Sequence, residues 1–264
     1  MRVWAVSNQK GGVGKTTTAV TLAALLSARG ERTLLLDLDP HGSLSSYFGF
    51  DPDTAEESVY SLFSEGVSAV SRLAQSLPFS GMDLLPASTA MATLDRQLGT
   101  QDGKGLVISR ALDRVSMHYD CAIIDCPPML GVLMVNALAA CERLIVPVQT
   151  EFLALKGLER MLHTLTMITR ARHQQLPYIV VPTLFDRRTR ASTESLRHLR
   201  ERYADNVWSG VIPVDTQFRD ASQAGVPLPL FKPGGRGTLA YSGLLDVLLA
   251  ASEQRVKDDA VAMQ

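Results

Sequence analysis

A short apolar segment, a glycine-rich turn and a helical segment follow one another within the first 28 residues, and this order constrains the chain most. Residues 3–7 are mostly apolar, residues 8–14 contain three glycines, and residues 16–28 repeat apolar side chains at the helical period. Glycines let successive backbone N–H groups turn inward, and a helix N-terminus adds the positive end of its dipole. The arrangement predicts a phosphate-binding loop, with Lys15 on the β- and γ-phosphates and the Thr16 hydroxyl as a ligand of Mg²⁺.

Short apolar runs alternate with longer helical stretches along the rest of the chain. After the first strand, at residues 3–7, the strands expected are residues 33–37, 82–86, 122–125, 144–148 and 179–182. Most of these runs are apolar throughout, which is typical of parallel strands covered by helices on both faces. The expected fold class is therefore α/β, a doubly wound and mostly parallel sheet. Residues 1–264 contain no repeat and no evident linker, which favours a single domain.

Composition excludes several classes of protein. Hydrophobic residues make up 46% of the chain, enough for a large core, so the chain is neither a disordered tail nor a disulfide-stapled miniprotein. The net charge of −1 provides no general attraction to nucleic acid or to an anionic membrane. Cys121, Cys126 and Cys141 form no CxxC pair and lie in apolar surroundings, which predicts reduced core thiols. No secretion signal or membrane-spanning run is evident, so we expect a cytoplasmic protein.

Acidic side chains follow two of the predicted strands. Asp37 and Asp39 come at the end of the strand at residues 33–37, and Asp125 ends the strand at residues 122–125. Ligands of open α/β sheets bind at the carboxyl ends of the strands. A lone aspartate at such a place is most often a turn or helix cap. Three acids on two strands beside a phosphate loop instead favour a site for Mg²⁺.

The loop departs from the strict phosphate-loop pattern in one informative way. Gln9 stands where that pattern begins with glycine, and Lys10 adds a second lysine. The run KGGVGKTT that begins at Lys10 resembles the deviant Walker A motif of the ParA/MinD family of ATPases, and the resemblance covers residues 1–250, leaving residues 251–264 as a helix end or tail. It implies that ATP or ADP is bound by the loop residues Gly11, Gly12, Val13, Gly14, Lys15, Thr16 and Thr17.

The same resemblance implies a catalytic set and a dimer. In the family the early lysine, here Lys10, reaches the nucleotide of a second copy, so the ATP-bound chain is expected to be a homodimer. The DLDP run at residues 37–40 resembles a switch segment whose second acid, here Asp39, orients the attacking water. The catalytic residues implied are therefore Lys10, Lys15 and Asp39, acting in a slow ATP hydrolase that a partner regulates.

Magnesium binding is implied for residues from three segments. The strand that ends at Asp125 resembles a Walker B strand, whose acid holds the ion through water. Asp37 is expected to support the same coordination shell. The metal set is therefore Thr16, Asp37 and Asp125.

Three features sort the chain within this family. The C-terminal run at residues 253–260 mixes charges and lacks aromatic residues, so membrane insertion is not expected. The cysteines are not paired in the way that a shared iron–sulfur cluster requires. Lys10 separates the chain from relatives that resemble dethiobiotin synthetase. What remains is the ParA type, which positions or segregates a cargo.

Most ParA proteins bind nonspecific DNA as ATP dimers, and the sequence leaves that property open here. Partition members are expected to carry arginine near the turn at residues 212–213, whereas this chain has Asp215 and no arginine before Arg219. An arginine-rich run upstream is a possible substitute for those phosphate contacts. Its members are Arg187, Arg188, Arg190, Arg197, Arg200 and Arg202. The alternative interpretation of this run is a solvated helix face.

The switch segment points to a subgroup. Asp39 is followed by Pro40, His41 and Gly42, where partition members usually have glutamine in place of His41. Together with residues 1–12 and 51–53, this segment resembles the ParA-like branch encoded with polar chemotaxis genes, often called ParC. The resemblance implies positioning of chemotaxis arrays through a protein partner, with recruitment to the cell pole. His41 itself is expected to be a loop residue near the nucleotide.

Two other functions stay open at this stage. One is a chromosome or plasmid partitioning ATPase that binds DNA nonspecifically and works with a ParB-like adaptor. The other is a metabolic ligase or kinase built on the same loop, although nothing in the chain resembles a small-molecule acceptor site. The weakly patterned stretch at residues 51–104, in which several short helices are expected, has no assigned role.

Overall fold

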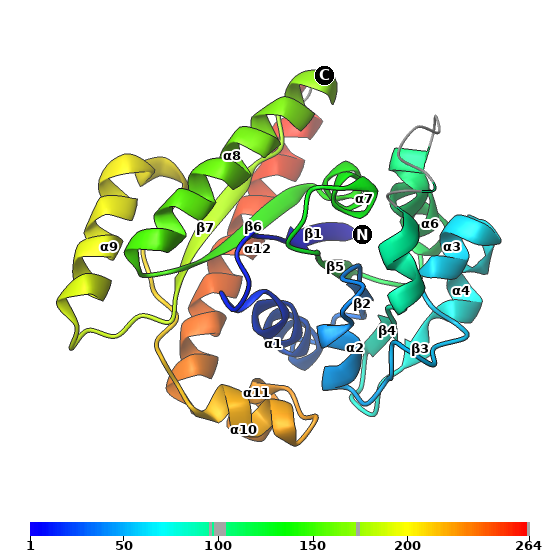
Figure 1. Ribbon diagram of the computed structural model, residues 1–264, viewed down its shortest axis with the longest axis horizontal. Coiled ribbons are helices and arrows are strands. Elements are labelled where there is room, and N and C mark those ends of the chain that lie inside the picture. The colour runs from blue at the N-terminus through cyan, green and yellow to red at the C-terminus, as the bar shows by residue number, and fades with distance from the viewer. Residues whose placement is uncertain (95–96, 98–103, 173–174, 263–264) are drawn as a thin grey trace.

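A seven-stranded sheet forms the centre of the computed structural model, which describes residues 1–94, 97, 104–172 and 175–262 (Figure 1). The strand order is β3-β4-β2-β5-β1-β6-β7, and every pairing is parallel except that of β3 with β4. The strands are β1 (Arg2–Val6), β2 (Thr33–Asp37), β3 (Gln75–Ser76), β4 (Met82–Leu85), β5 (Cys121–Asp125), β6 (Arg143–Gln149) and β7 (Tyr178–Thr183).

The predicted fold class is confirmed. Each predicted strand is present with both ends within one residue of the expected positions. The edge strand β3 was not predicted, because two residues are too few to show any periodicity.

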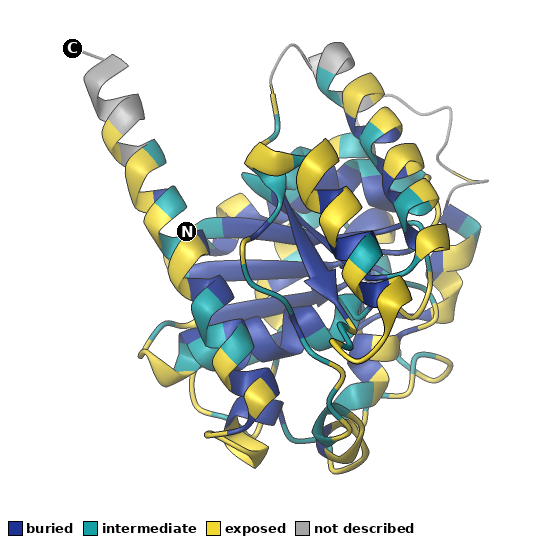
Figure 2. Cartoon of the chain, turned by 90° about the vertical axis from the view of Figure 1, so that its left-hand side faces the viewer, coloured by how far each residue is buried: buried dark blue, intermediate teal, exposed yellow. Residues whose placement is uncertain are grey.

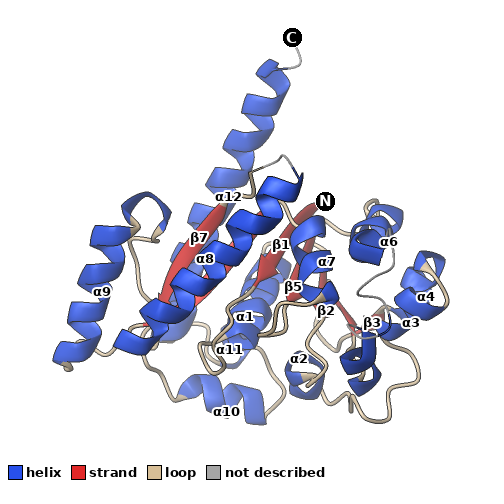
Figure 3. Ribbon diagram, turned by 45° about the horizontal axis from the view of Figure 1, so that its top comes forward, coloured by secondary structure: helices blue, strands red, loops and turns tan. Residues whose placement is uncertain are grey.

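Helices cover both faces of the sheet (Figure 3). One face carries α1 (Lys15–Ala28), α2 (Ser43–Tyr47), α10 (Gln217–Gln223), α11 (Leu228–Phe231) and α12 (Arg236–Ala262). The other face carries α3 (Tyr60–Ser64), α4 (Val70–Leu73), α6 (Val107–Val115), α7 (Val132–Ala140), α8 (Phe152–Arg172) and α9 (Arg190–Arg202). Short 3₁₀ turns complete the chain at η1 (Val67–Ala69), η2 (Thr89–Thr93), η3 (Lys104–Leu106) and η4 (Ala204–Asn206).

The alternation of side chains along each strand divides the interior into two cores. In β1, Trp4 and Val6 pack with α1 and α12, whereas Val3 and Ala5 pack on the opposite face with α6, α7 and α8. Successive residues of a strand point to opposite faces, so a strand covered on both sides must be apolar throughout. Figure 2 shows the result, a buried sheet between helices that are exposed on their outer sides.

Strand register brings the candidate site residues to one edge of the sheet. The strand β5 lies between β1 and β2, so Asp125 is the register partner of Val6 on one side and of Asp37 on the other. Because Val6 is the last residue of β1, the glycine-rich loop begins beside the two acids.

Other predictions of the sequence analysis can be placed on this fold. Cys121, Cys126 and Cys141 are buried thiols, as expected. The stretch at residues 51–104 consists of short helices around the small strands, although residues 95–96 and 98–103 lie outside the described part, as do residues 263–264 of the tail. Within the described residues, no helix combines the length and the apolar character needed to span a membrane.

Candidate nucleotide-binding site

The glycine-rich loop wraps toward the N-terminus of α1. Gly12 and Gly14 have φ angles of +72° and +91°, a region that residues with a Cβ atom rarely adopt. A Cβ atom added at Gly11, Gly12 or Gly14 would meet no other atom within 4 Å, so the inner side of the loop faces open space. The helix starts directly at Lys15, where its first backbone N–H groups are unpaired and favour an anion.

Two buried side chains hold this loop in place. The Asn8 amide donates to the carbonyl of Pro147 at 2.7 Å, and its oxygen accepts the backbone N–H of Lys10 at 3.0 Å. The Thr183 hydroxyl, at the end of β7, donates to the carbonyl of Val13 at 2.8 Å. The loop is thereby tied to β6 and β7. Sequence reasoning missed both anchors; the only local signal was Asn8, a residue type that often bonds the backbone two residues on.

The two predicted loop side chains point to different parts of the site. The Lys15 ammonium donates to the carbonyl of Lys10 at 3.4 Å, which places its charge across the mouth of the loop. The Thr16 hydroxyl donates to Oδ2 of Asp125 at 2.6 Å. The other carboxylate oxygen of Asp125, Oδ1, is buried and has no hydrogen-bond partner.

Asp37 is fully engaged within the protein. Its Oδ1 accepts the backbone N–H of Asp39 at 3.2 Å, and its Oδ2 accepts the backbone N–H and the hydroxyl of Ser45 at 2.8 and 2.7 Å. Asp37 therefore fixes the path of the chain from β2 into α2, a role that the sequence analysis did not foresee. Its contribution to a magnesium shell stays a prediction.

Both strand-terminal acids have a raised pKa. Burial is the main cause for both, and repulsion from a neighbouring carboxylate adds to it, that of Asp39 for Asp37 and that of Asp37 for Asp125, so the pKa rises to about 7 for Asp37 and to about 8 for Asp125. A nearby cation would lower the pKa of both acids, because it favours their charged forms. The unpartnered Asp125 oxygen beside the Thr16 hydroxyl fits such a cation.

The donor set also limits the kind of ion that this site could hold. In the part of the chain that the structure describes, no three His, Cys, Asp or Glu side chains converge as a protein cage. An ion here would take most of its ligands from phosphate oxygens and water, which is the usual manner of Mg²⁺ in nucleotide sites.

Asp39 lies one turn beyond β2 and is directed by its own loop. Its Oδ1 accepts the backbone N–H of His41 at 3.1 Å and lies 2.8 Å from the imidazole Nδ1 of the same residue. The Asp39 side chain is largely buried, whereas the His41 ring is exposed. His41 is thus a loop residue, as expected from the sequence, and its nearness to a nucleotide stays a prediction.

Lys10 is bound to the end of β6. Its ammonium forms an ion pair with Glu151 and donates to Oε1 of Gln149 at 3.3 Å. A hollow of about 540 Å³ lies on this side of the loop. Its wall includes Lys10 and the exposed apolar side chains of Met129, Leu130 and Leu153. Exposed apolar side chains that cluster in this way usually mark a surface that binds another molecule.

The arginine-rich run lies on and before α9. Within residues 186–202, which are all described, four of the six arginines form ion pairs with carboxylates of the same chain. The pairs are Arg188–Asp186, Arg190–Glu194, Arg197–Glu201 and Arg202–Glu159. Arg200 instead donates to the carbonyl of Ser209. The predicted basic helix face is present, but much of its charge is matched locally.

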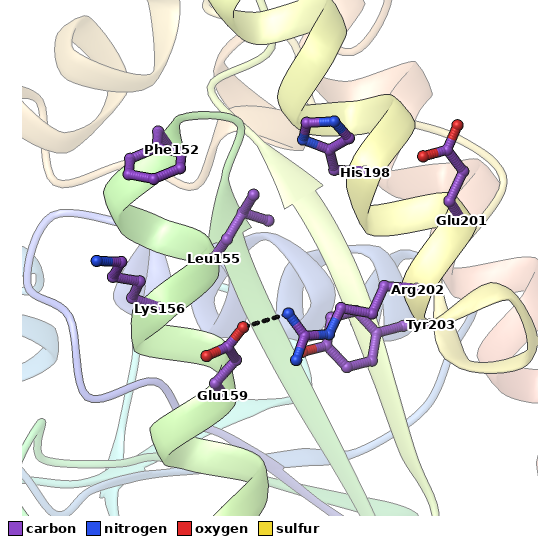
Figure 4. Close-up of a pocket in the computed structure, with 8 residues that line it drawn as sticks. All are labelled: Phe152, Leu155, Lys156, Glu159, His198, Glu201, Arg202 and Tyr203. Atoms are coloured by element: carbon purple, nitrogen blue, oxygen red, sulfur yellow. Dashed lines mark hydrogen bonds and ion pairs between the residues drawn. The ribbon is translucent and has the colours of Figure 1, made fainter.

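Figure 4 shows how the run meets α8. Leu155 and Glu159 on α8 point toward α9 across a hollow of about 470 Å³, and the Arg202–Glu159 pair bridges it. Each wall carries a basic and an acidic group, Lys156 and Glu159 on α8 and Arg202 and Glu201 on α9. This hollow is well separated in sequence from the glycine-rich loop and was not anticipated.

The turn where partition proteins are expected to carry arginine is instead closed by an acid. Oδ1 of Asp215 accepts the backbone N–H of Gln217 at 3.0 Å, and its Oδ2 accepts that of Gly237 at 3.4 Å. Asp215 thereby links the starts of α10 and α12. The acid at this position has a structural role that an arginine could not fill.

The sheet, the loop and the acids together define a P-loop nucleoside-triphosphate-binding protein. Comparison with known proteins then gives the family. AAA_31, described as an AAA domain, matches residues 1–178. The chain is 34% identical to the sporulation initiation inhibitor protein Soj of Bacillus subtilis over 92% of its length and 96% of that protein. It is also 34% identical to the chromosome partitioning protein ParA of Caulobacter vibrioides, over 97% of its length and 96% of that protein. The chain belongs to the ParA/MinD family of P-loop ATPases.

A solved structure has the same fold. Cobyrinic acid a,c-diamide synthase from Mycobacterium smegmatis, with bound ADP and magnesium, superposes with a TM-score of 0.82. It is 35% identical, and the match covers 96% of this chain and 95% of that one.

Proposed function

We propose that this chain is an ATP-dependent switch of the ParA type, which dimerises with ATP and positions or segregates a cellular cargo. The single observation that carries the proposal is the loop with its second lysine beside two buried strand-terminal acids. Relatives named for sporulation control and chromosome partitioning support it.

The site residues would bind phosphate, hold magnesium and orient the attacking water. Backbone N–H groups of residues 11–17 and the Lys15 ammonium would neutralise phosphate charge. Magnesium would be held at the Thr16 hydroxyl and near Asp125, where it would balance the charge of the phosphates and the buried acids. Asp39 would orient the water that attacks the γ-phosphate.

Lys10 would make dimerisation depend on the nucleotide. It would leave Glu151 and reach the phosphates of a second copy, and the exposed apolar residues around it would be covered in that dimer. Release of the phosphate that hydrolysis produces would remove the charge that attracts Lys10, so the pair would separate afterwards. We expect turnover well below the ~10 s⁻¹ typical of metabolic enzymes.

For the cargo, we propose polar chemotaxis arrays reached through a protein partner. The local ion pairs of the arginine-rich run support this choice, since arginines that are already matched by carboxylates displace fewer counterions from DNA. The acid at Asp215, in the turn where phosphate contacts were expected, points in the same direction.

A DNA-based function is the second candidate. Surface ion pairs contribute only about 0–1 kcal/mol each, so Arg190 and Arg197 could exchange their glutamates for phosphates at small cost. The similarity to chromosome partitioning proteins supports a nucleoid-bound ATPase with a ParB-like adaptor equally well.

An amide-forming ligase would be a third possibility, in view of the Mycobacterium smegmatis synthase. Such an enzyme needs an acceptor pocket beside the γ-phosphate. The hollow next to Lys10 is lined by exposed Met129, Leu130 and Leu153 as well as by basic residues, and this exposed apolar part favours contact with a protein surface over a small acceptor. ATP turnover that requires an added small-molecule acid would favour the ligase.

Retention on nonspecific duplex DNA separates the first two functions. The Asp39→Ala protein, which we expect to hold ATP as a dimer, is applied with ATP, ADP or no nucleotide across a salt series. The matched control is a double replacement of Arg190 and Arg197 by glutamine in the same background.

Each outcome of this experiment selects one function. Absence of ATP-dependent retention, from a sample shown to be dimeric, supports positioning through a protein partner. Retention that weakens with salt and is lost in the arginine control supports DNA-based partitioning and contradicts the chemotaxis proposal.

A further inference from the structure

The turn after β2 contains a side-chain contact that the proposed function does not use. Both the backbone N–H and the imidazole Nδ1 of His41 meet the same oxygen, Oδ1 of Asp39, at 3.1 and 2.8 Å. The backbone N–H of Gly42 donates to the Asp39 carbonyl at 2.8 Å and closes the turn. One residue thus directs two donors at one oxygen of the carboxylate.

The backbone of this turn is fixed from several sides. Pro40 restricts its own φ, and Gly42 has a φ of +61° where an added Cβ would lie 2.7 Å from Pro52. The backbone N–H of Asp39 is bound to Asp37. With the backbone held in this way, the main freedom left to Asp39 is rotation of its carboxylate, and the His41 ring restrains that rotation.

The chemistry of the contact assigns the proton. A carboxylate only accepts hydrogen bonds, so Nδ1 of His41 must carry the hydrogen. The His41 side chain is 81% exposed and the Asp39 side chain 13%, so the ring can turn its other nitrogen to water while it covers the carboxylate.

We propose that His41 is a positioning residue for Asp39: its Nδ1–H holds Oδ1, so that Oδ2 is the oxygen that orients the attacking water. The inference rests on the proposed hydrolytic role of Asp39. In the described residues, both protein donors to the Asp39 carboxylate reach Oδ1, and Oδ2 is left for solvent. A carboxylate without the imidazole would sample other orientations and would meet the water correctly for less of the time.

Three substitutions of His41 distinguish a positioning role from a mere turn-stabilising one. The side-chain nitrogen of asparagine lies where Nδ1 lies, whereas that of glutamine corresponds to Nε2. We therefore expect His41→Ala and His41→Gln to lower kcat about tenfold with the KM for ATP changed by less than about twofold. His41→Asn should recover kcat to within about threefold of the unmodified protein. Equal kcat in all four proteins would overturn the proposal, whatever their thermal stability.

The tautomer of His41 gives a readout that is independent of activity. Nitrogen NMR of the nucleotide-free protein should show the His41 ring protonated at Nδ1, and Asp39→Ala should remove that preference. A ring protonated only at Nε2 in the unmodified protein would overturn the contact itself.

The same set of proteins separates this inference from the proposed function. If Asp39→Ala hydrolyses ATP at the unmodified rate, the proposed function fails first. If Asp39→Ala is inactive while His41→Ala keeps full kcat, only the positioning role of His41 fails.

Discussion

The pH dependence of stability in the nucleotide-free protein tests the buried acid pair. In the folded chain the pKa of Asp37 is raised to about 7 and that of Asp125 to about 8, whereas both titrate near 3.9 when unfolded. Between pH 5 and pH 7 the folded protein therefore holds protons that the unfolded chain has released. Stability is greatest below the unfolded pKa and falls as the pH rises through this window.

The size of the effect follows from proton linkage. One retained proton lowers the free energy of unfolding by about 1.4 kcal/mol for each pH unit, which is about 3 kcal/mol between pH 5 and pH 7. This figure counts the proton of one acid, here Asp125. Asp125→Asn removes one of the two charges and keeps an acceptor for the Thr16 hydroxyl. Between pH 5 and pH 7, we expect the free energy of unfolding of this variant to fall by about 3 kcal/mol less than that of the unmodified protein.

Urea unfolding at several pH values, followed by fluorescence of the two tryptophans, measures the difference. Other groups titrate in this range, so the quantity of interest is the gap between the two proteins at each pH. Asp246→Asn is the control, because Asp246 is exposed and paired with Arg29 at the surface. If the free energy of unfolding depends on pH in the same way for Asp125→Asn and for the unmodified protein, Asp125 does not have the raised pKa on which this prediction rests.

Three further substitutions test the loop. Lys15→Ala should weaken ATP binding at least about 100-fold by calorimetry because it removes the charge at the loop mouth, and undiminished affinity would contradict the assignment. Lys10→Ala should bind ATP normally yet stay monomeric in light scattering and hydrolyse little; normal turnover would show that this lysine is idle. Thr183→Val should lower the free energy of unfolding by about 1–3 kcal/mol, because it leaves the Val13 carbonyl unpaired. A change below about 0.5 kcal/mol in denaturant unfolding would mean that the anchor contributes little.

Most of the framework could be predicted from local sequence. The strands are continuous apolar runs, and the glycines with Lys15 and Thr16 form a contiguous motif. The acids at Asp37 and Asp125 end two strands that the register pairs side by side. In each case the signal lies within one short segment.

What escaped prediction depends on contacts between distant segments. Asn8 bonds a residue of β6, Thr183 bonds the loop from β7, and Lys10 pairs with Glu151. No periodicity in a single sequence reports such pairings. Arg190 and Glu194 are four residues apart on a helix, a spacing from which their ion pair can be predicted. The pairing of Arg202 with Glu159 joins two helices and cannot be predicted from local spacing.

The central claim is that ATP brings two copies of this chain together, and light scattering of the Asp39→Ala protein tests it most directly. The protein is measured with ATP and Mg²⁺, with ADP and Mg²⁺, and without nucleotide, with Lys10→Ala in the same background as control. We expect twice the 28.7 kDa chain mass with ATP and Mg²⁺, and the single mass in the other two states and in the control. A single mass with bound ATP would contradict it.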